Sequence, residues 1–158
     1  MSYQLTNNTW AEIDQSKFSN FMVTPEKGIA VKIVNKTGAA SVKGMLVETN
    51  ETTSGGFEEL GDLYDCIGIV YESGIADGAE CFVVISGIAE VLLKDTTAST
   101  TGNWVKAADT NGRADATLAL PSGGTIAQLR EHFQEIGHCI ETKTAGTDVL
   151  AKIVLHFN

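Results

Sequence analysis

The hydrophobic residues of this chain gather in short runs and alternations that are typical of β-strands. The densest run lies between Glu80 and Lys94, and only Ser86 and Gly87 interrupt it. A run rich in Val and Ile is typical of a strand covered on both faces, and the glycine at its middle argues against a buried helix. A glycine inside a strand pattern usually marks a bulge or a sharp bend. We therefore predict two strand segments joined by a kink, at the centre of the fold.

Shorter strands are predicted on both sides of this run. Apolar positions bounded by turn residues predict strands at residues 29–34, 42–47, 67–71, 104–108, 113–118, 136–140 and 150–157. Asn111-Gly112 separates two of them and is a strong hairpin signal, because both residues tolerate a positive φ. Residues 50–56 are predicted as a loop, and Ile126, Leu129 and Phe133 recur at helical spacing. The only internal helix is therefore expected at residues 125–135, with Thr125 as a candidate cap.

The N-terminal residues are polar, with isolated aromatic side chains among them. Their spacing fits a short amphipathic helix about as well as an irregular arm, and Pro25 ends the segment. Trp10, Phe18 and Phe21 either pack on the protein's own strands or grip a neighbouring molecule, and both alternatives stay open. We divide the chain into an N-terminal arm at residues 1–26 and a β-domain at residues 27–158.

A weak internal repeat supports the β-fold. A Gly-x-x-Val segment occurs at residues 44–47 and again at 102–105. Each is followed by an apolar segment that begins with Ile-Gly, at residues 67–72 and 136–141. Two similar β-units around one core would form a small closed or nearly closed barrel, which leaves few exposed strand edges. The predicted fold class is mainly β: a small β-barrel or sandwich-like domain with one short helix and an N-terminal arm.

Charge and cysteine content narrow the classes of partner. The chain has 158 residues and a net charge of −9, and its eleven basic residues are scattered. Nucleic-acid binding needs a basic stripe, and anionic membranes attract basic surfaces, so neither partner is expected. The three cysteines lack CxxC spacing and predict buried free thiols. The first residues lack the basic and apolar parts of a signal peptide, so synthesis in a cytoplasm is expected.

No catalytic motif is present, and no enzymatic activity, cofactor or metal site is predicted. The histidines at positions 132, 138 and 156 lie on different predicted elements, and a zinc site built from His138, Cys139 and a third ligand lacks paired spacing. Residues 109–112 resemble the start of a calcium loop without its later acidic ligand, and are explained as the hairpin turn. The acidic residues at positions 58, 59, 62 and 65 are interpreted as a solvated face.

The order of these signals resembles the phage capsid decoration, or cement, proteins. The residues that carry the resemblance are 80–91, 102–105 with 111–114, and 135–139 with 145–147 and the closing strand 149–157. The resemblance extends over residues 27–158 and implies a small β-rich protein that binds the outside of a phage head as a homotrimer. It implies the major capsid protein as partner, the virion surface as location after assembly in the host cytoplasm, and a head-stabilising role without catalysis.

Three segments depart from the pattern of this family: the N-terminal 25 residues, an apparent insertion at 50–62, and the helix in place of a short turn. The alternative function is a carbohydrate- or receptor-binding module of a phage fibre or tail, with Trp104, Tyr64 and Tyr71 as stacking candidates. A trimeric hydrolase is a third class, for which no pair of nucleophile and base is found. As a decoration protein, the chain would contact the capsid through Trp10, Phe18 and Phe21.

Overall fold

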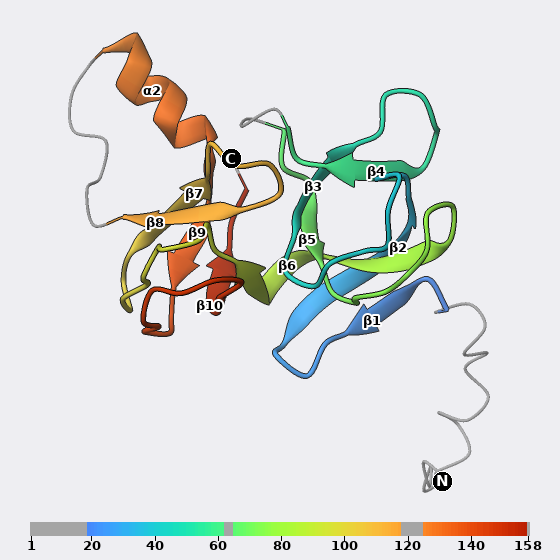
Figure 1. Cartoon of the computed structure of the whole chain (residues 1–158), viewed down its shortest axis with the longest axis horizontal. Helices are drawn as coiled ribbons and strands as arrows, with labels where there is room; N and C mark the ends of the chain where they lie inside the picture. The colour runs from blue at the N-terminus through green and yellow to red at the C-terminus, as the bar shows by residue number, and fades with distance from the viewer. Residues whose placement is uncertain (1–18, 62–64, 118–124, 158) are drawn as a thin grey trace, which may run out of the picture.

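The computed structural model describes residues 19–61, 65–117 and 125–157. These residues form one ten-stranded sheet and one short helix (Figure 1). The strands are β1 (Phe21–Val23), β2 (Gly28–Asn35), β3 (Leu46–Thr49), β4 (Gly56–Glu59), β5 (Gly68–Val70), β6 (Glu80–Leu92), β7 (Trp104–Ala107), β8 (Ala114–Thr117), β9 (Glu135–Cys139) and β10 (Leu150–Leu155), and the helix is α2 (Ile126–Phe133). The prediction of a mainly β fold with one short helix is confirmed.

Strand β6 is the central element, as its sequence predicted. The two predicted segments form one continuous strand of 13 residues, and the kink predicted between them is a β-bulge. In the pairing with β2, Ile29 lies opposite Ser86 and Ala30 opposite Val84, which leaves Ile85 as the extra residue of β6. Gly87 has a φ of 83°, and a Cβ at this position would lie 2.5 Å from the Lys27 carbonyl oxygen. The glycine therefore lets β6 bend closely past the start of β2 without ending the strand.

The two parts of β6 belong to two groups of strands. The first part pairs with β2 and β5, and the chain of pairings β2–β4–β3–β5–β6 closes on itself, which is the connectivity of a small barrel. The second part pairs with β10, followed by β9, β7 and β8, and a parallel bridge between Leu93 and Ala114 brings the end of β6 beside β8. Figure 1 shows β6 running from one group into the other.

The two groups repeat the same strand order, β4–β3–β5–β6 and then β8–β7–β9–β10. This matches the internal repeat seen in the sequence. One apolar core runs through both groups, with Leu46, Ile69 and Val84 from the first and Val105 and Ile153 from the second. The two groups of strands therefore share this core, and the first group holds a second buried cluster that includes Val47, Phe57 and Val83.

Of three local features, one was predicted from the sequence and two were not. The hairpin at Asn111-Gly112 is confirmed as the turn between β7 and β8. Strand β4 lies inside residues 50–62, where the sequence suggested an insertion and no strand was predicted. Strand β1 lies within the predicted arm, where a helix or an irregular segment was expected, and pairs with β2 at the edge of the sheet. The described part of the arm is therefore part of the sheet.

Candidate functional site

An apolar surface lies on the hairpin formed by β1 and β2. Phe21, Val23 and Ile29, here called the edge patch, are 43%, 64% and 38% exposed. Phe21 pairs with Val31 and Val23 pairs with Ile29, so these side chains share one face of the hairpin. β1 is also the first strand of the sheet, with no described strand on its outer side. The edge patch is the candidate site for contact with a partner.

The hairpin is held firmly against the rest of the fold. Met22 points to the opposite face from Phe21 and packs against the core. Thr24 is buried, and its Oγ1 accepts a hydrogen bond of 2.9 Å from the Gly28 amide, while its own amide donates to the Gly28 carbonyl at 2.8 Å. These contacts hold the edge patch in place before any partner binds.

Of the three predicted contact residues, only Phe21 lies in the part of the chain that the structure describes. Its exposure agrees with a contact role. Trp10 and Phe18 lie outside the described residues. The sequence missed Val23 and Ile29, although their alternation with Met22 and Ala30 is visible once β1 is recognised as a strand.

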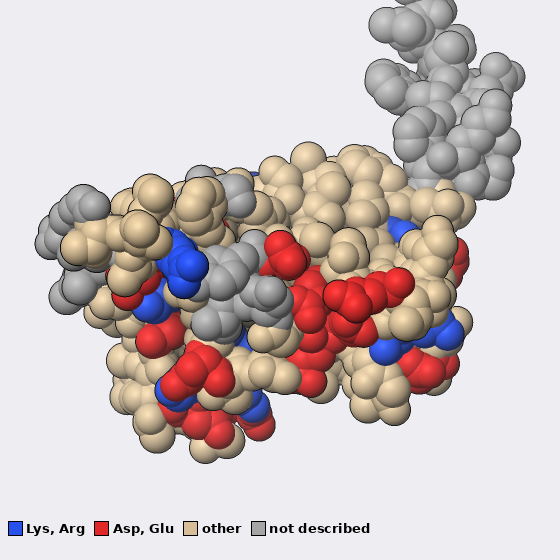
Figure 2. Space-filling view, turned by 90° about the horizontal axis from the view of Figure 1, so that it is seen from above, with Lys and Arg blue, Asp and Glu red and all other residues tan. Residues whose placement is uncertain are grey.

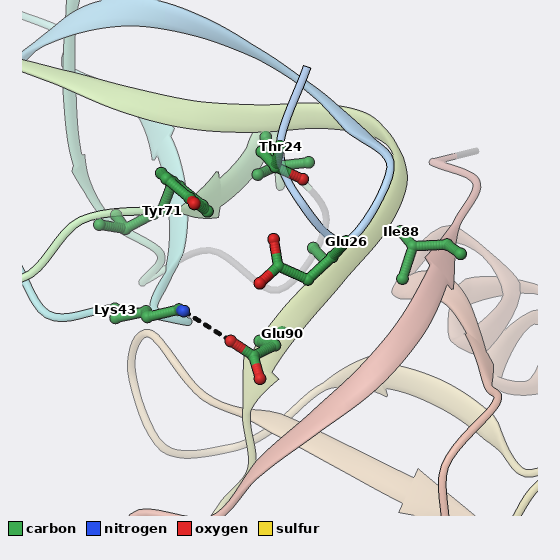
Figure 3. Close-up of a pocket in the computed structure, with 9 residues that line it drawn as sticks. Thr24, Glu26, Lys43, Tyr71, Ile88 and Glu90 are labelled. Carbon is green, nitrogen blue, oxygen red and sulfur yellow. Dashed lines mark ion pairs between the residues drawn. The ribbon is translucent and has the colours of Figure 1, made fainter. Parts of the chain in front are cut away.

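Next to this hairpin lies a narrow pocket that contains an ion pair (Figure 3). Lys43 Nζ lies 2.5 Å from Glu90 Oε2 and 5.4 Å from the centre of the Tyr71 ring. The hydrogen bond to Glu90 raises the pKa of Lys43, and the nearby Glu26 carboxylate adds to this effect. The side chains that line this pocket lie so close together that it has no room for a substrate.

Acidic side chains gather around β3 and β4. Figure 2 shows such a cluster on the face seen from above. Glu48, Glu51, Glu58 and Asp65 line a hollow of about 90 Å³, and Glu48 lies directly opposite Glu58 in the strand pairing. Asn50 Nδ2 donates a 2.5 Å hydrogen bond to Glu58, and the Gly61 amide donates to Glu48 at 3.1 Å. Of the residues interpreted as an acidic face, Glu58 and Asp65 line this hollow, whereas Glu59 points to the opposite face of β4 and Asp62 lies outside the described residues.

A second apolar surface lies on α2. Ile126, Leu129 and Phe133, here called the helix stripe, are 74%, 58% and 52% exposed. The helix itself was predicted from these residues, but an apolar stripe usually faces the core. Here His132 lies against the sheet instead, with its ring centre 6.0 Å from that of Trp104. Figure 1 shows α2 at the end of the molecule away from β1, so the two apolar surfaces are well separated.

The two stacking candidates among the described residues, Trp104 and Tyr71, do not form a sugar-binding platform. Trp104 is only 2% exposed, and Tyr71 is covered by Lys43. Tyr64 lies outside the described residues.

Asp109 of the possible calcium loop forms a 2.6 Å ion pair with Lys94 and sits in the hairpin turn. The side chains of His138 and Cys139 point to opposite faces of β9, so they cannot share one zinc ion.

His138 lies beside His156 and Glu135, a grouping that the sequence did not reveal. His132 is not a member of this group. Among the described residues, no other group of three or more potential metal ligands lies this close together.

None of the described helices is long and apolar enough to cross a membrane. Neither the comparison with protein-family models nor the comparison with curated proteins finds a match for this chain.

Proposed function

We propose that this protein is a structural component of a phage virion, which binds the outer surface of the head and stabilises it. The partner is the major capsid protein, and the contact includes the edge patch. The observation that carries the proposal is the exposure of Phe21, Val23 and Ile29 on a firmly held hairpin. This hairpin directly follows the N-terminal segment that the sequence singled out for contact. The resemblance of residues 27–158 to decoration proteins supplies the identity of the partner.

The edge patch offers useful binding energy per copy. Burying a large apolar side chain completely is worth about 1.5–3 kcal/mol, and these three side chains are each about half exposed. Covering all three would therefore contribute roughly 2–4 kcal/mol before the cost of association. That is a modest amount for one copy. A capsid that carries many copies is stabilised at every site, because a ligand that binds only the assembled state favours that state.

We further propose that the protein acts as a homotrimer. The helix stripe is a second apolar surface, at the other end of the molecule from the edge patch. A cement protein on a threefold site must contact both its neighbours and the shell, which requires two separate surfaces. The helix stripe is assigned to contact between copies. The mass of the free protein by light scattering tests this assignment. A mass of 16.8 kDa, that of one chain, for free wild-type protein that is able to bind heads would refute a trimer formed in solution.

The alternative function, a sugar- or receptor-binding module of a fibre or tail, receives less support. Its best stacking candidate, Trp104, is only 2% exposed, and its ring lies beside that of His132 on α2. The pocket that the described residues form beside Tyr71 is too narrow for a sugar ring. Binding of the protein to glycans, with no binding to heads, would favour this alternative.

The decisive experiment adds purified protein to undecorated heads assembled from the major capsid protein of the same phage. Occupancy is measured by sedimentation, and the temperature of head rupture by calorimetry. The wild type should saturate the heads and raise the rupture temperature, whereas the variant Phe21→Ser/Val23→Thr should bind at least tenfold more weakly. The matched control, Val42→Thr/Ile140→Ser, also removes two exposed apolar side chains, which belong to neither the edge patch nor the helix stripe, and should still bind. Absence of binding by the wild type would refute the proposed function.

A further inference from the structure

Glu135, His138 and His156, here called the His–Glu cluster, come together on the outer face of β9 and β10. Glu135 Oε1 lies 3.3 Å from His156 Nε2 and 3.6 Å from His138 Nε2. One ligand atom from each residue lies within 4.8 Å of the other two. The centres of the two imidazole rings are 4.9 Å apart, and the rings are tilted by 54°. Both rings therefore direct a nitrogen towards the same carboxylate oxygen.

A β-bulge puts Glu135 and His138 on the same side of the sheet. In a regular strand, residues three positions apart point to opposite faces. Between β7 and β9, however, Val105 pairs with Gly137 and Lys106 with Glu135, so Ile136 is an extra residue. The extra residue reverses the alternation, with the result that Ile136 is buried while Glu135 and His138 face outwards.

The pairing of β9 with β10 brings in the third member. Val154 lies opposite His138, and the His156 amide donates a hydrogen bond of 3.0 Å to the Ile136 carbonyl. His156 is two residues beyond Val154 and therefore points to the same outer face. Gly137 permits this close pairing, because a Cβ there would overlap the Val154 carbonyl oxygen. Its φ of 152° is also one that other residues rarely adopt.

The distances in the cluster fit a tetrahedral metal ion. Zinc binds imidazole nitrogen and carboxylate oxygen at about 2.0–2.2 Å, so two ligand atoms of a tetrahedral site lie about 3.3–3.5 Å apart. The two carboxylate–imidazole distances in the structure, 3.3 and 3.6 Å, agree with this spacing. A charge-assisted hydrogen bond would be shorter, at about 2.7–2.9 Å. Two imidazoles and one carboxylate are also a ligand set that favours zinc over calcium and magnesium, which prefer oxygen ligands.

We propose that Glu135, His138 and His156 bind one Zn²⁺ ion through two imidazole nitrogens and one carboxylate oxygen. The Glu135 side chain is only 10% exposed and provides a fixed ligand. The imidazoles are 48% and 43% exposed, which leaves the fourth position of the ion open to water. The ion links the start of β9 to the residue that follows β10, and so it stabilises the C-terminal end of the fold. This site replaces our sequence-based expectation that the chain holds no metal.

The test uses the untagged full-length protein after treatment with a chelator and its removal by dialysis. Titration with ZnCl₂ in a calorimeter should give one site per chain, and CaCl₂ and MgCl₂ should give no binding at the same concentrations. At a zinc concentration a hundred times the dissociation constant, the melting temperature should rise by about 5–10 °C. Replacing zinc with Co²⁺ should give the strong visible absorption of a tetrahedral site.

Single variants distinguish this site from other zinc-binding groups. His138→Gln and His156→Gln should each lower the zinc affinity at least tenfold and remove the visible absorption of Co²⁺, and both positions are exposed enough to tolerate the change. His132→Gln is the matched control, because His132 is the only other histidine of the chain, and it should retain the affinity. Wild-type protein that binds no zinc at millimolar concentration overturns the proposal. So do His138→Gln and His156→Gln variants that bind as tightly as the wild type, because the zinc would then lie elsewhere.

Discussion

Arg113 joins three segments of the second group of strands, and its replacement tests how they are held. It follows the hairpin turn between β7 and β8, and its side chain is 21% exposed. Nη1 donates to the carbonyl oxygen of Leu93 at 3.0 Å and to Asp95 Oδ1 at 2.9 Å, and Nη2 lies 2.5 Å from Asp148 Oδ1. The Asp148 amide in turn donates to Asp95 at 3.1 Å. One guanidinium therefore organises the end of β6 and the loop before β10.

The magnitude of the effect follows from the environment of each contact. A hydrogen bond from a charged group to a carbonyl contributes about 1.5–3 kcal/mol, and Leu93 is buried, so its carbonyl oxygen would lose a partner. Asp95 and Asp148 are 48% and 66% exposed, so the two ion pairs together add only about 0–1 kcal/mol. Arg113→Met keeps most of the apolar stem and should lower the free energy of unfolding by about 2–3 kcal/mol. The melting temperature should fall by about 5–10 °C.

Urea denaturation followed by tryptophan fluorescence measures this free energy. The matched control is Lys94→Met, which breaks the Lys94–Asp109 ion pair on the surface nearby and should cause no measurable change. Arg113→Lys should recover only part of the loss, because an ammonium group lacks the two-pronged geometry of guanidinium. A stability of Arg113→Met within about 0.5 kcal/mol of the wild type would refute the reasoning. In 1 M NaCl most of the difference should persist, since the bond to a carbonyl is screened less than an exposed ion pair.

Three further predictions concern the thiols, a glycine and the edge patch. Burial raises the pKa of the Cys66 thiol to about 12, so a thiol reagent at pH 8 should react slowly with folded protein and fast in urea. As the pH rises, the Cys66 thiol ionises in the unfolded protein before it does so in the folded protein. The contribution of Cys66 to the free energy of unfolding should therefore be intact below pH 9 and lost as the pH rises to about 12. Urea denaturation across this pH range measures the loss. Gly137→Ala should lower the free energy of unfolding, measured by urea denaturation, by at least about 2 kcal/mol. Gly38→Ala should lower it by only about 1 kcal/mol, because Gly38 has a φ of 75° but no atom within 4 Å of the new Cβ. Equal losses would contradict the overlap at Gly137. Phe21→Ser should change the melting temperature of the free protein little, whereas Met22→Ser should lower it clearly, because Met22 packs on the core. A larger drop in melting temperature for Phe21→Ser than for Met22→Ser would show that β1 faces the other way.

Much of the fold could be predicted because its signals are local. The apolar run of β6, the Asn-Gly turn and the helical spacing of α2 each depend on residues close together in the chain. The conformations that these residues favour do not require knowledge of the rest of the molecule. The repeated order of signals in the two halves also matched the repeated strand order.

The features that the sequence did not reveal depend on distant contacts. Strands β1 and β4 are short and lack a clear pattern, and their pairing with β2 makes them strands. The helical spacing showed that Ile126, Leu129 and Phe133 share a face, but periodicity does not say whether that face meets the core or a partner. Only the tertiary structure, in which these three side chains are exposed, showed that this face points outwards.

The sequence by itself determined the β-rich class of this protein, its central strand, its hairpin and its helix, because local preference and alternation act over a few residues. The candidate sites were decided by the tertiary structure. The bulge at Ile136 reverses the alternation of β9, and the pairing with β10 brings His156 to His138 from 18 positions away in the chain. No spacing in the sequence carries that information, because the position of a bulge and the register between strands are set by which side chains fit the shared core.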